Sequence, residues 1–154
     1  AQSYQILQES RSDLKQFADD PWDANQSAWV GLAARGLERR QEAWQHLAST
    51  LNWARRNHQF MELMVALAGI ALLLADEGEA ERAMELYALA SRYPFVANSA
   101  WFEEVIGRHI SASAASLAPD VVAAAQERGQ VRVLVDTLAE LVAEFTPRAS
   151  PGPF

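Results

Sequence analysis

The chain has 154 residues and a formal net charge of −7. Nucleic-acid binders usually carry a basic face, so this charge argues against a nucleic-acid partner. Cysteine is absent, which excludes disulfides, thiol catalysis and thiolate metal sites. Alanine occurs 29 times, against seven glycines and six prolines. Because alanine loses least on helix formation, this composition favours a helical protein.

The first residues and the most apolar stretch indicate whether the protein is secreted or inserted in a membrane. The first residues form neither the charged nor the apolar region of a signal peptide. The 13 uncharged residues from Leu63 to Ala75 are fewer than the roughly 18 that a membrane span needs. We therefore expect a buried core helix over this stretch, no membrane partner and a cytoplasmic protein.

Prolines and glycines divide the chain into alanine- and leucine-rich blocks that we expect to be helices. Pro21, Pro94, Pro119 and Pro147 fall between blocks or after the last one, where a proline costs least. Gly78 and Gly129 follow blocks, as C-terminal caps often do. The expected helices span 2–18, 24–37, 40–56, 59–76, 79–92, 98–117, 119–128 and 130–145. No stretch alternates as a strand does, so the sequence predicts an all-α fold.

A shift of about 40 residues, a length typical of helical repeats, aligns the chain with itself. The apolar and aromatic positions that coincide are Val30 with Ile70 and Ile110, and Leu7 with Leu47 and Tyr87. The shift predicts antiparallel helix pairs, A then B, that stack into an α-solenoid. The helix over 130–145 would cap the stack through an apolar stripe of Val131, Leu134, Leu138, Leu141 and Val142. We expect one helical repeat domain over 1–145 and a flexible tail over 146–154.

The second helix pair resembles a tetratricopeptide repeat. Gly78, Ala83, Tyr87 and Ala90 match the glycine, alanine, aromatic and alanine of that family. In the first pair Glu38 replaces the turn glycine, and the 40-residue period exceeds the usual period of about 34 residues. The segments 88–99 and 121–129 further resemble the C-terminal modules of large bacterial STAND-type signalling ATPases and related transcriptional regulators. The resemblance implies a sensor or protein-binding arm. A phosphate-binding Gly-x-x-x-x-Gly-Lys loop is absent from the sequence.

Metal binding and catalysis find little support in the sequence. His46, His58 and His109 are far apart, and a zinc site needs at least three protein ligands. We therefore expect no metal and no cofactor. Glu103 and Glu104 are adjacent and cannot form a facing carboxylate pair on a helix, and the serines near His109 lack a nucleophile-elbow pattern. The sequence thus predicts a protein that is not an enzyme.

The five tryptophans are expected mainly in the core, because each aromatic ring buries a large area. Trp22 and Trp101 stand at helix starts and are the candidates for exposure. An aromatic ligand cage is the alternative reading of this set.

Helix A of each pair lines the inner groove of a tetratricopeptide array. The resemblance places seven candidate partner-binding residues there: Asn25, Leu32, Arg35, Val65, Leu72, Asp76 and Arg108. The second pair would contribute an apolar strip with charged residues around it, which suits an amphipathic helix or an extended peptide. In the alternative interpretation the final helix or adjoining repeats cover this strip.

Together these observations predict a non-catalytic protein-interaction or sensor module of a bacterial signalling or regulatory protein. A protein or peptide partner would bind along the helix-A groove. Two alternatives stay open: a small-molecule sensor with a pocket between helix pairs, and a structural repeat that mediates self-association.

Overall fold

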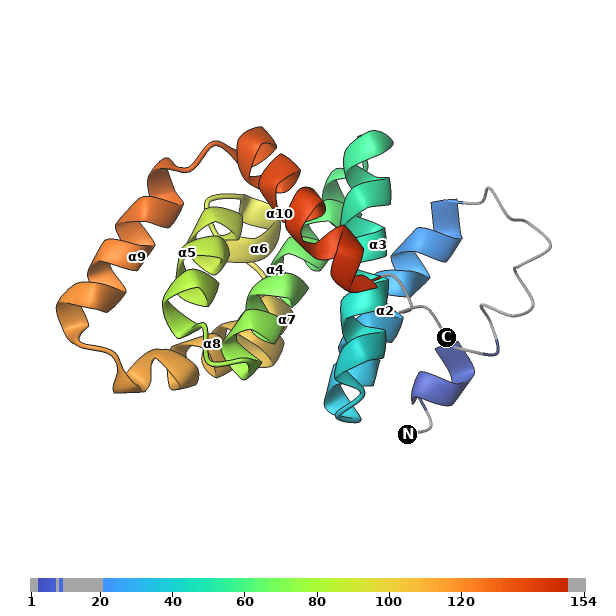
Figure 1. Ribbon diagram of the computed structural model, residues 1–154, viewed down its shortest axis with the longest axis horizontal. Coiled ribbons are helices and arrows are strands. Elements are labelled where there is room, and N and C mark those ends of the chain that lie inside the picture. Colours follow the sequence, from blue (N-terminus) through green and yellow to red (C-terminus); the bar gives the residue numbers. More distant parts are fainter. Residues whose placement is uncertain (1–2, 8, 10–20, 150–154) are drawn as a thin grey trace. The chain divides into compact units, whose positions relative to one another are not determined.

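Every described element of the computed structural model is a helix, which confirms the all-α prediction (Figure 1). The structure describes residues 3–7, 9 and 21–149. The chain forms two compact units, one of Ala1–Ala66 with Glu140–Phe154 and one of Leu67–Ala139. These units subdivide the segment that the sequence analysis treats as one domain. The helices α4 (Phe60–Asp76) and α10 (Leu134–Ala149) contribute residues to both units.

The first unit is built on α2 (Pro21–Gly36) and α3 (Arg40–Arg56), which pack against each other. They approach closely at Gly31, where a Cβ would lie 2.9 Å from Cγ of Leu47. The α10 residue Phe145 stacks on Trp44, with ring centroids 4.6 Å apart. Small residues at the helix crossing and aromatic residues beside it therefore form this core.

The second unit contains α5 (Ala80–Ala90), α6 (Pro94–Ala97) and α9 (Pro119–Val131). Between α6 and α9 the chain forms one interrupted helix. It consists of α7 (Ala100–Phe102), the π-helix η2 (Glu103–Gly107), α8 (Arg108–Ser113) and the 3-10 turn η3 (Ala114–Ser116). Figure 1 shows α9 lying alongside α5, and α8 also contacts α5.

The helix bounds follow the shift that aligns the sequence with itself. When the repeat length is added to the residue numbers of α4, the result is 100–116. This range is the span of the interrupted helix from α7 to η3. Moving α5 in the same way gives 120–130, which lies within α9. The three aligned positions Val30, Ile70 and Ile110 are all fully buried. The repeat is thus visible in the backbone as well as in the side chains.

The ends of α2, α3 and α4 share one type of turn. The turns that follow these helices contain Glu38, His58 and Gly78, which have φ values of 59°, 56° and 86°. The next residue in each turn donates its N–H to a carbonyl five residues earlier at 2.9 Å, as in Arg39 to Ala34. This is the Schellman arrangement. The three turns are evenly spaced along the chain, at intervals of half a repeat.

The apolar stretch from Leu63 to Ala75 is buried throughout, as expected for a core helix. Within the described residues no helix has the length and apolar character needed to cross a membrane. Helix α4 is apolar on all sides, and such a helix is stable only when every side is covered.

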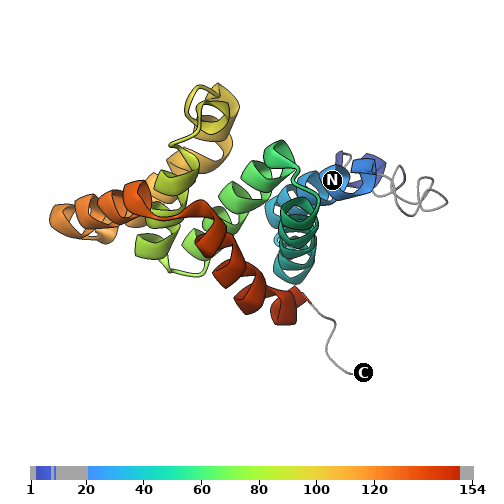
Figure 2. The same ribbon diagram turned by 90° about the horizontal axis from the view of Figure 1, so that it is seen from above.

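The structure corrects three predictions at helix ends. Gly129 is not a cap, because α9 continues to Val131 and the chain then turns before α10 begins at Leu134 (Figure 2). Val131 is 79% exposed and therefore does not belong to the apolar stripe of the last helix. The segment predicted as a flexible tail over 146–154 is helical as far as Ala149, so Pro147 lies within α10, and residues 150–154 lie outside the described residues. Of the expected helix over 2–18, residues 3–7 and 9 are helical, and the rest lies outside the described residues.

The α10 stripe is otherwise close to the predicted one. Leu138 and Leu141 are buried, and Leu134 and Val142 are half-buried. Phe145 extends the stripe by a further turn, because it stands four residues after Leu141 on the same helix face.

Candidate functional site

The predicted helix-A groove is not open at its apolar centre. Val65 is 4% exposed and Leu72 is fully buried, so neither side chain is available to a partner. The physical reason is the uniform apolarity of α4, which is buried as a core helix and cannot line a solvent-filled groove. The prediction of a binding strip at these two positions is therefore wrong.

The other predicted partner-binding residues lie in varied surroundings. Leu32, Arg35 and Asp76 are half-buried, while Arg108 is exposed and pairs with Glu104 at 2.7 Å. Asn25 lies on α2, and its side chain is outside the described part of the structure. These positions therefore do not define a binding surface by themselves.

The tryptophans follow the core prediction only in part. Trp44 is buried, Trp53 and Trp101 are half-buried, and Trp29 is 37% exposed. Trp101 packs edge-on against Phe102, with ring centroids 5.0 Å apart. Trp22 is the other predicted candidate for exposure, and its side chain lies outside the described part of the structure.

A cleft in the second unit is the better candidate site. It has a volume of about 820 Å³ and lies between α5, the interrupted helix and α9. Because both other helices pack on α5, α5 forms the floor and the others form the walls. The lining residues are Met84, Tyr87, Ala88 and Ser91 of the floor and the segment that follows it, Glu103 and Ser111 of one wall, and Ala123, Gln126, Glu127, Gln130 and Val131 of the other.

The π-helix brings an acidic and a phenolic group together in this cleft. A Cβ on Gly107 would collide with the carboxylate of Glu103 and would lie 2.9 Å from the hydroxyl of Tyr87. The absence of a side chain at Gly107 thus leaves room for both groups. Burial first, and then the charge of Glu103, raise the pKa of Tyr87 to about 12, against a hydrogen bond from Ser91 that lowers it. The phenol is therefore protonated at every physiological pH.

Two glutamines on the α9 wall direct their amide N–H groups toward α5. Nε2 of Gln126 donates to the sulfur of Met84 at 3.7 Å, and Nε2 of Gln130 donates to the carbonyl of Ala88 at 3.4 Å. The carbonyl oxygen of each side-chain amide can only accept hydrogen bonds. The α9 wall is therefore rich in acceptors.

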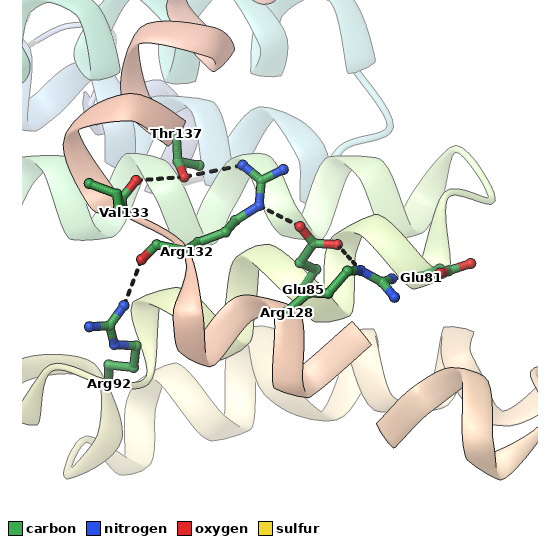
Figure 3. A network of polar contacts seen from close by, with 7 residues as sticks. All are labelled: Glu81, Glu85, Arg92, Arg128, Arg132, Val133 and Thr137. Atoms are coloured by element: carbon green, nitrogen blue, oxygen red, sulfur yellow. Dashed lines mark hydrogen bonds and ion pairs between the residues drawn. The ribbon is translucent and has the colours of Figure 1, made fainter. Parts of the chain in front are cut away.

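An ion-pair network outside the cleft attaches α9 to α5 (Figure 3). Glu85 receives a hydrogen bond from Nε of Arg128 at 2.8 Å and another from Nε of Arg132. Arg128 also bonds Glu81 at 2.5 Å. Burial would raise the pKa of the Glu85 carboxyl, but Arg128 and Arg132 together hold that pKa below its ordinary value of 4.5. The network fixes the side of α9 that faces α5.

The same network extends to the turn between α9 and α10. Arg92 donates to the carbonyl of Arg132 at 2.7 Å, and Arg132 donates to the hydroxyl of Thr137 at 3.2 Å. Figure 3 shows Arg132 between the Glu85 carboxylate and Thr137. The wall of the cleft that α9 forms is therefore anchored at its C-terminal end.

Sequence reasoning missed this cleft, although one signal was present. Ala123, Gln126, Glu127 and Gln130 recur at i, i+3, i+4 and i+7, which places them on one face of α9. A polar stripe of that kind is usually read as solvated surface. The π-helix at Glu103 has no such sequence signature.

No group of three or more potential metal ligands is found among the described residues. The chain matches no protein-family model, no curated protein and no solved structure. The assignment of a function therefore depends on the geometry of the cleft.

Proposed function

We propose that the chain is a non-catalytic interaction module that binds a peptide segment of a partner protein in the second-unit cleft. The observation that carries the proposal is the cleft itself, an open space of about 820 Å³ bounded by three helical segments. We further propose that the module belongs to a bacterial signalling or regulatory protein and is a tetratricopeptide-like solenoid. The recurrence of the helix bounds, and the turns spaced by half of that period, support this architecture.

The composition of the cleft walls supports a peptide as the ligand. Ala123 and Val131 of α9 supply exposed apolar surface, the largely buried Met84 and Ala88 line the floor, and the glutamines and glutamates supply acceptors. Such a mixture suits an extended chain that carries both apolar and polar groups.

The protonation state of Tyr87 supports a binding role over a catalytic one. A phenol with a pKa of about 12 is a poor general base near neutral pH, because catalytic groups work best with a pKa close to the operating pH. Tyr87 is thus better suited to contact a bound ligand than to accept a proton from it.

A small-molecule sensor is the second candidate function. The volume of the cleft lies within the range of about 300–1,000 Å³ that small-molecule sites occupy. The cleft is open to solvent along α9, where Ala123 and Val131 are both exposed. An open site of this shape favours the peptide over a ligand that must be enclosed.

A matched pair of variants tests the proposed function. Ala123→Trp places an indole in the cleft, whereas Ala124→Trp places it on the neighbouring exposed position outside the lining. A displayed library of random peptides is selected on the unmodified chain, and the dissociation constants of the enriched peptides are measured with both variants. We expect the first variant to abolish binding and the second to preserve it. Equal binding to both variants, or no enrichment at all, would overturn the proposal.

A further inference from the structure

We infer that the cleft recognises the guanidinium group of an arginine side chain in the partner's peptide. This inference rests on the proposed function and names the chemistry of the ligand. It follows from the hydrogen-bonding groups and charges that line the cleft.

The two walls each contribute one carboxylate without a cationic partner. Glu103 stands on the π-helix and Glu127 on α9. Neither carboxylate forms an ion pair or a hydrogen bond with another described residue, whereas the neighbouring Glu104 is paired with Arg108. Arginine and lysine are absent from the lining residues. The cleft thus carries negative charge that the described chain leaves uncompensated.

The remaining polar groups of the cleft are chiefly acceptors. Gln126 and Gln130 donate their side-chain N–H groups to acceptors on α5, which leaves their side-chain carbonyl oxygens to accept from a ligand. The hydroxyls of Ser91 and Ser111 can accept as well as donate. A ligand that fits this set must bring several donors and a positive charge. An anionic ligand would meet two carboxylates and is disfavoured by repulsion.

The geometry favours guanidinium over ammonium. Guanidinium presents five N–H donors in a planar fork, which suits acceptors spread over two walls, and it stacks on aromatic rings. Tyr87 on the floor supplies a half-buried aromatic ring beside the carboxylate of Glu103. An ammonium group is a compact charge with three donors and would engage fewer of these groups.

The size of the cleft indicates that the arginine arrives as part of a peptide. A volume of about 820 Å³ exceeds what one guanidinium fills. The exposed apolar side chains of Ala123 and Val131 in the cleft lining can take the aliphatic stem of the arginine and a neighbouring side chain.

The test uses a blocked tetra-arginine peptide and its tetra-citrulline counterpart. Citrulline has nearly the same shape as arginine but no charge, so the pair isolates the guanidinium charge. Spermine is the third probe and represents a free polyamine. Dissociation constants are measured by calorimetry with the full chain at two salt concentrations. We expect the arginine peptide to bind at least about tenfold more tightly than the citrulline peptide, because hydrogen bonds to charged groups are the stronger ones.

Glu103→Gln and Glu104→Gln form the matched pair of variants. They remove the same unit of charge at adjacent positions, but only Glu103 lines the cleft. We expect Glu103→Gln to raise the dissociation constant of the arginine peptide about tenfold. Glu104→Gln should change that constant by less than about twofold. Gly107→Ala gives a second measurement, because the added methyl group displaces the Glu103 carboxylate while retaining its charge. We expect a loss of binding there too. Thermal unfolding of each variant shows that it is folded.

Each contrary outcome has a distinct meaning. Equal effects of the two glutamine variants would overturn the inference, since a chain of net charge −7 attracts basic peptides everywhere on its surface. Spermine binding more tightly than the peptide, with the same dependence on Glu103, would overturn the assignment to a peptide. Selected peptides that require the cleft but contain no arginine would overturn the inference and leave the proposed function intact.

Discussion

Helix α4 and the segment 100–116 occupy the same place in the repeat, but one is core and the other is a wall of the cleft. Leu63, Leu67 and Ala71 of α4 follow one another at intervals of four residues and are all buried. One repeat later the same positions hold Glu103, Gly107 and Ser111. The polar members of this second set line the cleft, and the glycine beneath them makes room for the carboxylate.

Under the proposed function, the later segment lines the binding cleft while the corresponding segment α4 supports the fold. The two segments share one buried position, because the aligned residues Ile70 and Ile110 are both fully buried. The opposite face changes from apolar to polar, and the regular helix of α4 becomes the π-helix and 3-10 turn of the later segment. Single-turn π-helices are frequent at functional sites. The contrast between the two segments can be tested by substitutions whose expected changes in unfolding free energy range from large to small.

The largest effect is expected for Leu67→Ala in α4. Leu67 is fully buried, so truncation should lower the free energy of unfolding by about 2–5 kcal/mol. Ser111→Ala in the later segment should change that free energy by less than about 0.5 kcal/mol, because Ser111 is exposed. Chemical denaturation of both variants measures the difference. Similar losses for both would contradict the division into core and cleft wall.

The next effect concerns the close approach of α9 to α5. A Cβ on Gly129 would lie 2.7 Å from Cβ of Ala88 and would collide with the backbone carbonyl of Glu85. Gly129→Ala should therefore cost about 1–3 kcal/mol in unfolding free energy through overpacking. Gly36→Ala is the control, because a Cβ on Gly36 meets no atom within 4 Å. A midpoint for Gly129→Ala equal to that of the control would refute the close contact.

Substitutions in two of the recurring turns should change the stability of the protein in opposite directions. Gly78→Ala introduces a Cβ at a φ of 86° and should destabilise the protein by about 1 kcal/mol. His58→Gly removes a Cβ at a φ of 56° and should stabilise it by about the same amount. Thermal unfolding of the two variants checks the signs. A loss of stability in both would show that the two turns are not equivalent.

The smallest expected effect is the contribution of the Glu85 ion pairs to the pH dependence of the unfolding free energy. The folded-state pKa of Glu85 is lowered, so its contribution to stability is present above the ordinary pKa of 4.5 and is lost as the pH falls through the folded-state value. Because the arginines are partly exposed, we expect a contribution of about 1 kcal/mol or less. Glu85→Gln should reduce the stability difference between pH 6 and more acidic solution. An unchanged pH profile would show that the ion pairs contribute nothing.

The helices were predictable from sequence to within a few residues where local chemistry decides them. The apolar block of α4 and the proline that begins α9 are visible in any reading of the chain. The identical spacing of Val30, Ile70 and Ile110 also follows from sequence, and all three are buried as the repeat requires. These features depend on contacts close in the chain or on plain apolarity.

The cleft was not predictable because it depends on packing between distant segments. Gly129 has the sequence appearance of a helix cap, and only the approach of α5 shows that its missing side chain is needed for contact. Glu103 has the appearance of surface charge, and only the folded structure places it beside Tyr87, which belongs to a different helix. The groove that the family resemblance implies would run along α4, but α4 is apolar on all sides and is therefore buried.

The most direct test of the account is a nuclear magnetic resonance titration of the labelled chain with the tetra-arginine peptide. The account predicts that backbone amide shifts concentrate at cleft residues such as Tyr87, Gly107 and Gln126, and that the aligned α4 positions Leu63, Leu67 and Ala71 stay unchanged. Shifts spread evenly over the acidic surface, or centred on α4, would contradict the assignment of the binding site to the later repeat.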